Sequence, residues 1–229
     1  MEEPLYHALR LLGAPFRFRV MGMEHVRTGG PAVYVANHCG NLGPVVIVLS
    51  VPLRFYPWVK ADLLDPRRSP AHLYREFGQR TLHLSPGPGM ALMRVISWIT
   101  VPLLRAIGCI PVESQGFYTS DAFRRSLGLL MQGANVLIFP EDALRPLDEE
   151  TMLHPFNMGF VQLCRLYRRM ALADLPLYPV AVSPPARAIA IGEPQFYRED
   201  GDGHWRERIQ EFGAHIQAEV GRMIRALER

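Results

Sequence analysis

The stretch Gly29-Gly-Pro-Ala-Val-Tyr-Val-Ala-Asn-His38 decides how the rest of this chain is interpreted. Residues 31–36 form an apolar run rich in β-branched and aromatic side chains, and a Gly-Gly-Pro turn precedes it. A short apolar run bounded by turn residues predicts a buried strand. The polar residues Asn37 and His38 follow directly, at the end of a strand, where α/β proteins place functional side chains.

Outward from this strand, apolar stretches of strand length alternate with stretches of helical periodicity. Strands are predicted at 54–60, 108–112, 135–139 and 177–182, and helices at 42–53, 120–133 and 158–173. The last helix, at about 205–228, is the clearest, because its apolar residues recur every three or four positions: Ile209, Phe212, Ile216, Val220, Met223 and Leu227. This alternation predicts an α/β fold, a central sheet flanked by helices.

The length of 229 residues suits a single domain that covers 1–229. Residues 65–94 differ from their surroundings, being rich in arginine and ending near Pro86-Gly-Pro-Gly89, and they predict a surface insertion with one short helix. No run of about 18 apolar residues occurs, since the best candidate, 95–104, is short and contains Pro102, so we expect no ordinary transmembrane helix. The N-terminus carries Glu2 and Glu3 and does not resemble a secretory signal.

Charge and cysteine content narrow the possible functions. The net charge of +3 suits anionic partners such as lipid headgroups or coenzyme A phosphates and does not by itself distinguish them from nucleic acid, which we do not expect as a partner. Three cysteines without a C-x-x-C spacing argue against a disulfide scaffold or a thiolate zinc site, and indicate a reducing compartment. The eight histidines form no metal-ligand pattern, so neither a metal nor a bound cofactor is expected.

His38 is the candidate general base, because the pKa of histidine lies near neutral pH. Cys39 beside it suggests a nucleophile, but adjacent residues of a strand point to opposite faces, and we interpret Cys39 as a small packing residue. Glu141, in Phe139-Pro-Glu141 at the end of another predicted strand, could bind a hydroxyl, orient the histidine or merely cap a turn.

In order and spacing, these segments resemble the glycerolipid (1-acylglycerol-3-phosphate) acyltransferase family over residues 16–196. The resemblance rests on Asn37-His38, on residues 108–112, on Phe139-Pro-Glu141 and on residues 178–182, which correspond to the family's four blocks. Three further features agree with it: Lys60, the only lysine of the chain, Phe156-Asn-Met-Gly159 and Ile191-Gly-Glu-Pro194. Three positions depart from the family pattern. Gly43 stands where the first block has aspartate, Ser114 where the second has arginine, and Arg145 one place after the arginine of the third.

The resemblance implies a mixed central sheet and an O-acyltransferase. His38 and Glu141 would be catalytic, no metal would take part, and the substrate-binding residues would be Asn37, Lys60, Asp142 and Arg145. The acyl donor would be acyl-CoA or an acyl carrier protein, used as a co-substrate, and the acceptor a lysophospholipid or a related lipid alcohol. The protein would be cytoplasmic and peripheral to the inner face of a membrane.

Two alternatives stay open, both because of the departures from the family pattern. One is a catalytically impaired relative that binds lipid or acyl thioester without efficient turnover, since Gly43 cannot stabilise an imidazolium as aspartate would. Asp62, Glu141 or Asp142 could supply that carboxylate through the fold. The other is acyl transfer to an acceptor without phosphate, since phosphate recognition normally uses arginine.

Overall fold

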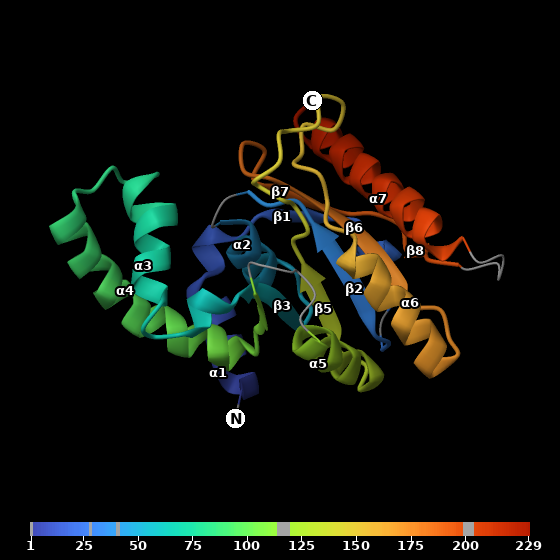
Figure 1. The fold of residues 1–229 in the computed structure, drawn as a ribbon, viewed down its shortest axis with the longest axis horizontal. Coiled ribbons are helices and arrows are strands. Elements are labelled where there is room, and N and C mark those ends of the chain that lie inside the picture. The colour runs from blue at the N-terminus through green and yellow to red at the C-terminus, as the bar shows by residue number, and fades with distance from the viewer. Residues whose placement is uncertain (1, 28, 40–41, 114–119, 199–203) are drawn as a thin grey trace.

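A computed structural model describes residues 2–27, 29–39, 42–113, 120–198 and 204–229 (Figure 1). Within these residues one sheet holds eight strands: β1 (Arg19–Met21), β2 (Ala32–Ala36), β3 (Phe55–Lys60), β4 (Ile110–Val112), β5 (Asn135–Ile138), β6 (Pro176–Ser183), β7 (Ala188–Ile191) and β8 (Gln195–Phe196). The α-helices are α1 (Glu2–Leu12), α2 (Leu42–Ser50), α3 (Ser69–Leu73), α4 (Pro86–Ile107), α5 (Ser120–Met131), α6 (Gly159–Ala171) and α7 (Trp205–Leu227). Short 3-10 helices occupy Ala14–Phe16, Met23–His25 and Ala61–Leu64, and a π-helical segment, η4, occupies Tyr74–Gln79.

The sheet is mixed, as expected, with strand order β1-β7-β6-β2-β5-β3-β4 and β8 paired to β6. Its centre is parallel, because β2 pairs in parallel with both β5 and β6, and β3 pairs in parallel with β4 and β5. β7 and β8 run antiparallel to β6. The carboxyl ends of β2, β3, β5 and β6 therefore meet at one edge of the sheet.

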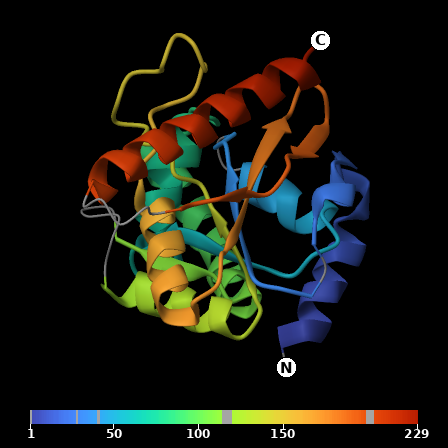
Figure 2. The same cartoon turned by 90° about the vertical axis from the view of Figure 1, so that its right-hand side faces the viewer.

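Helices cover both faces of the sheet (Figure 2). On one face the core of α5, α6 and α7 packs against Val33, Val35 and Ile138, and on the other α2 packs against Tyr34, Leu137 and their neighbours. All five residues of β2 are buried, as a central strand requires. α7 coincides with the predicted C-terminal amphipathic helix and buries Ile209, Ile216, Val220 and Met223 of the predicted stripe.

The region predicted as a surface insertion with one short helix is different in the structure. α3, η4 and α4 form a helical hairpin, residues 69–107, which projects beside the sheet in Figure 1. α4 begins in the Pro-Gly-Pro-Gly segment and ends at Gly108, whose φ of 82° is the left-handed conformation of a helix terminator. It is one continuous helix of 22 residues, long and apolar enough to cross a membrane by length and composition alone. The length of α4 was not predicted from the sequence, because Pro102 and several polar residues interrupt its apolar residues.

Candidate active site

Three of the predicted site residues come together at the carboxyl edge of the parallel strands. His38 lies two residues beyond β2, Lys60 is the last residue of β3, and Glu141 lies three residues beyond β5. The parallel pairing of these strands brings their ends side by side, although the residues are far apart in the chain. This edge is therefore the candidate active site.

Glu141 holds the backbone of two loops at this edge. One carboxylate oxygen accepts a hydrogen bond from the backbone N–H of His38 at 2.5 Å, and the other accepts one from the backbone N–H of His154 at 3.0 Å. Its own backbone forms a β-bridge with Phe156. Burial raises the pKa of the Glu141 carboxyl above its usual range, although both N–H groups oppose that shift. Glu141 thus fixes the position of His38, and its carboxylate does not contact the imidazole.

Asn37, a predicted substrate-binding residue, makes structural hydrogen bonds at the end of β2. Its side chain is buried, its amide oxygen accepts from the backbone N–H of Val182 at 2.7 Å, and its amide nitrogen donates to the Val182 carbonyl at 3.0 Å. These bonds join the end of β2 to β6 and occupy both ends of the Asn37 amide. The Cys39 thiol donates to the same carbonyl, and burial raises its pKa to about 11, which excludes a thiolate nucleophile at neutral pH.

The imidazole of His38 is accessible to solvent and lies edge-on to the Phe139 ring, with 5.8 Å between ring centroids. Desolvation by the surrounding protein lowers the pKa of His38 below its usual 6.5, and the positive charge of Lys60 lowers it further. A hydrogen bond to the residue's own carbonyl and the negative charge of Glu76 act in the opposite direction. His38 is consequently neutral near pH 7, the form that can accept a proton.

The helical hairpin contributes site residues that sequence reasoning missed. Lys60 and Glu76 influence the pKa of both His38 and His72, so the first turns of the hairpin lie near the catalytic candidate. His72 is buried, with its Nδ1 3.9 Å from a carboxylate oxygen of Asp62, and Glu76 pairs with Arg80 at 2.9 Å. The only signal in the sequence was a histidine and a glutamate spaced by four in a helical segment, which is too common to single them out.

Within the part of the chain that the structure describes, no hydrogen bond joins a carboxylate to the His38 ring. Among the described residues, the only hydrogen-bond partner of the His38 ring is its own backbone carbonyl. Of the three candidates, Glu141 binds the His38 backbone, Asp142 accepts from the backbone N–H of Leu144 in a tight turn, and Asp62 lies near Arg68 and His72. The role of Asp142 is therefore that of a turn residue. Gly43, at the aspartate position, is buried in the first turn of α2.

Arg145, a predicted substrate-binding residue, is not brought together with His38 and Lys60. It is exposed and lines a pocket between α5, α6 and α7 that includes neither of them. Ser114, the other departure from the arginine pattern, lies outside the described residues.

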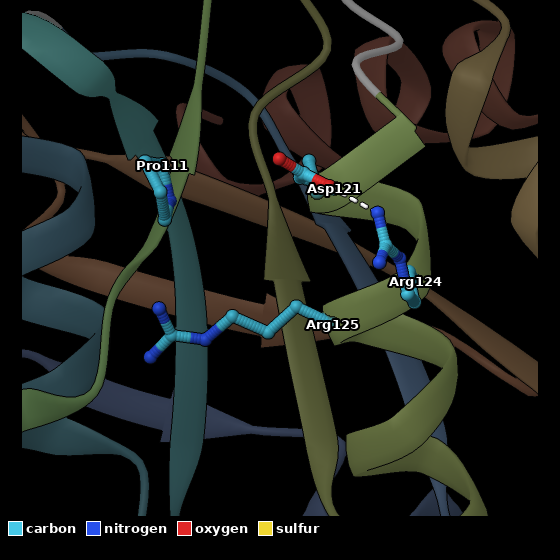
Figure 3. Close-up of a pocket in the computed structure, with 5 residues that line it drawn as sticks. Pro111, Asp121, Arg124 and Arg125 are labelled. Carbon is cyan, nitrogen blue, oxygen red and sulfur yellow. Dashed lines mark hydrogen bonds and ion pairs between the residues drawn. The ribbon is translucent and has the colours of Figure 1, made fainter.

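A smaller pocket, of about 360 Å³, lies between the end of β4 and the start of α5 (Figure 3). Pro111, Asp121, Arg124 and Arg125 line it, and the carboxylate of Asp121 pairs with Arg124. That ion pair neutralises half of the pocket's positive charge. No group of three metal-ligating side chains converges in the part of the chain that the structure describes.

Comparison with known proteins gives a likeness in fold. No family model matches the sequence, and no curated protein does. Among solved structures, the chain is similar to the 1-acyl-sn-glycerophosphate acyltransferase PlsC from Thermotoga maritima, with a TM-score of 0.61 and 15% identity. The match covers 99% of this chain and 81% of that one, so the two share a fold over nearly the whole length of this chain.

Proposed function

We propose that this protein is an O-acyltransferase, which moves a fatty acyl group from an acyl thioester to the hydroxyl of a lysophospholipid or a related lipid alcohol. The observation that carries the proposal is a neutral, accessible His38 held at the strand edge by Glu141, in a fold shared with an acyltransferase. The donor is acyl-CoA or an acyl carrier protein.

In this mechanism the His38 imidazole takes the proton of the acceptor hydroxyl as its oxygen attacks the thioester carbon. The carbon–sulfur bond then breaks, and the imidazolium returns the proton to the departing thiolate. The products are the ester and the free thiol, and no acyl-enzyme forms. General base catalysis of this kind contributes roughly 10² to 10⁴ in rate, and holding the two substrates together contributes independently of it.

Lys60 is the basic group best situated to meet an acceptor phosphate, since its charge reaches His38 whereas Arg145 lines a different pocket. A panel that compares lysophosphatidic acid with a monoacylglycerol of the same chain separates phosphorylated from unphosphorylated acceptors. If the acceptor phosphate binds Lys60, replacing Lys60 should raise the KM for lysophosphatidic acid and leave the KM for the monoacylglycerol unchanged.

The pH dependence of thiol release tests His38 as the base. Because burial and Lys60 disfavour the imidazolium, His38 keeps its proton-accepting form to below pH 6.5, and the rate should fall only under that value. Lys60→Met removes a neighbouring positive charge and should move this acid limb to higher pH, and Glu76→Gln should move it to lower pH. Steady-state profiles of both variants, with Arg67→Gln as an exposed control, measure the shifts. If the acid limbs of the Lys60→Met and Glu76→Gln profiles moved in the same direction, the assignment of His38 as the base would be contradicted.

We further propose that the protein docks on the inner face of a membrane through the helical hairpin. Val95, Trp98 and Ile99 form an exposed apolar strip on α4, with Trp98 87% exposed, and only 22% of the most apolar window of α4 is buried. Arg94 and Arg105 lie on the same helix and are exposed. Tryptophan and arginine are favoured at a membrane interface, and each surface arginine near an anionic leaflet contributes about 1 kcal/mol.

Vesicle co-sedimentation tests this docking. The parent protein should bind phosphatidylserine-containing vesicles more than phosphatidylcholine vesicles, and high salt should weaken the binding, since charge is screened within about 8 Å at physiological ionic strength. Val95→Asp with Ile99→Asp should abolish sedimentation. The matched control is Met131→Asp with Met170→Asp, two exposed apolar residues of α5 and α6, and should sediment like the parent. If both double variants lost vesicle binding equally, the helical hairpin would not be the membrane-docking surface.

A further inference from the structure

A second pocket lies on the other side of the sheet from His38. It has a volume of about 740 Å³, within the range of about 300 to 1,000 Å³ typical of small-molecule sites. Its walls include Phe156 and Ile209, which pack with the core under α5, α6 and α7, whereas Phe139, the ring beside His38, packs with the core under α2. The lining of this pocket includes neither His38 nor Lys60, although its Phe156 is joined by a β-bridge to Glu141 of the catalytic edge.

The lining of the pocket combines apolar and aromatic side chains with two arginines. Phe123, Phe156, Leu166 and Trp205 supply the apolar surface. Arg145 and Arg206 line the same pocket, and the guanidinium of Arg206 lies 4.6 Å from the centroid of the Trp205 ring. The one acidic lining residue, Glu207, lies 3.2 Å from the imidazole of His204. An apolar cavity with two arginines in its lining is complementary to an amphipathic anion.

Two unsatisfied donor features lie at the same wall. The Asn157 side-chain nitrogen is buried and has no hydrogen-bond partner among the described residues. α6, a helix of 13 residues, begins beside it at Gly159 with no side-chain cap on its first turn. An uncapped helix start favours a negatively charged acceptor oxygen, and turning the Asn157 side chain toward such a ligand would relieve its unpaired nitrogen.

We propose that this pocket binds a fatty acid, with the carboxylate near Arg145, Arg206 and Asn157 and the chain against Trp205, Phe156 and Leu166. The apolar lining fits the hydrocarbon chain, and the donors fit a single terminal anion. His38 and Lys60 do not line the pocket, and its test measures ligand binding and not acyl transfer, so the inference does not depend on the proposed activity.

Tryptophan quenching by a dibrominated stearate, used below its micelle concentration, tests the site. The chain has three tryptophans, and the exposed Trp98 is replaced by phenylalanine in every sample to remove its contact with lipid. Saturable quenching is expected, and it should be lost in Trp205→Phe. Gln162→Phe, which fills the pocket from α6, should abolish it as well. Quenching that persists in both variants would place the ligand elsewhere and overturn the proposal.

The charge requirement is tested with Arg145→Gln and Arg206→Gln combined. This variant should weaken carboxylate binding roughly 10- to 100-fold and leave binding of the matching brominated alcohol unchanged, since only the anion uses the guanidinium groups. Arg19→Gln with Arg67→Gln is the matched control, two exposed arginines that do not line the pocket, and should bind both ligands like the parent. Carboxylate affinity within twofold of the parent in the pocket variant would refute an anion site.

Discussion

Replacing His38 with alanine should lower the rate of thiol release from acyl-CoA by roughly 10² to 10⁴-fold. The imidazole of His38 is the neutral base proposed at this edge, and the variant removes it without disturbing what holds the loop. The bond from Glu141 reaches the backbone N–H of position 38, which alanine retains. The free energy of unfolding of His38→Ala, measured with denaturant, should therefore be almost the same as that of the parent protein.

The matched control is His215→Ala, an exposed histidine of α7. Thiol release is followed with acyl-CoA and with an acyl carrier protein, over a panel of lipid acceptors. Equal rates for the parent and His38→Ala would refute the catalytic assignment and favour a protein that binds lipid or acyl thioester without turnover.

Gly43→Asp should raise the rate of the parent protein by about tenfold or more. A serine protease loses about 10⁴ in turnover when the carboxylate beside its histidine is neutralised, so restoring such a group is expected to have a large effect. Position 43 can accept the side chain: the backbone there has no positive φ, and an added Cβ would lie 3.7 Å from the Phe139 ring and 3.6 Å from the Asn37 carbonyl. Those are ordinary contacts, beside the ring against which His38 lies.

The first turn of a helix also favours a negative side chain, so the substitution suits the start of α2. Gly43→Asn is the control, because asparagine has the same shape and no charge to stabilise an imidazolium. A gain in Gly43→Asp that Gly43→Asn does not share would identify the carboxylate as the missing partner. Equal rates for the three proteins would mean that the histidine works without one.

The central strands could be predicted from sequence because each is a local apolar run, and parallel pairing then brings His38, Lys60 and Glu141 to one edge. The helical hairpin could not be predicted, because α4 begins in a Pro-Gly-Pro-Gly segment that resembles a turn. Gly89 is needed there for tertiary packing, since a Cβ would lie 2.5 Å from the Tyr74 ring. β7 and β8, of four and two residues, were not among the predicted strands.

The roles within the site were less predictable than its location. Asn37 follows a strand as a substrate ligand would, but both ends of its amide bind β6, which only the folded chain brings near. Arg145 follows the third block, but its loop carries it to the pocket of α5, α6 and α7. The roles of these two residues depend on the path of the loop that follows each strand, and a loop has no sequence periodicity from which that path could be predicted.

Glu141 binds the backbone N–H groups of His38 and His154, so its hydrogen bonds do not depend on which side chains stand at those two positions. Selection for a folded chain and selection for catalysis therefore act on different atoms at this edge. Substitutions at positions 38 or 43 can remove or restore acyl transfer while the fold persists. A protein that loses turnover in this way can remain folded and keep a binding function.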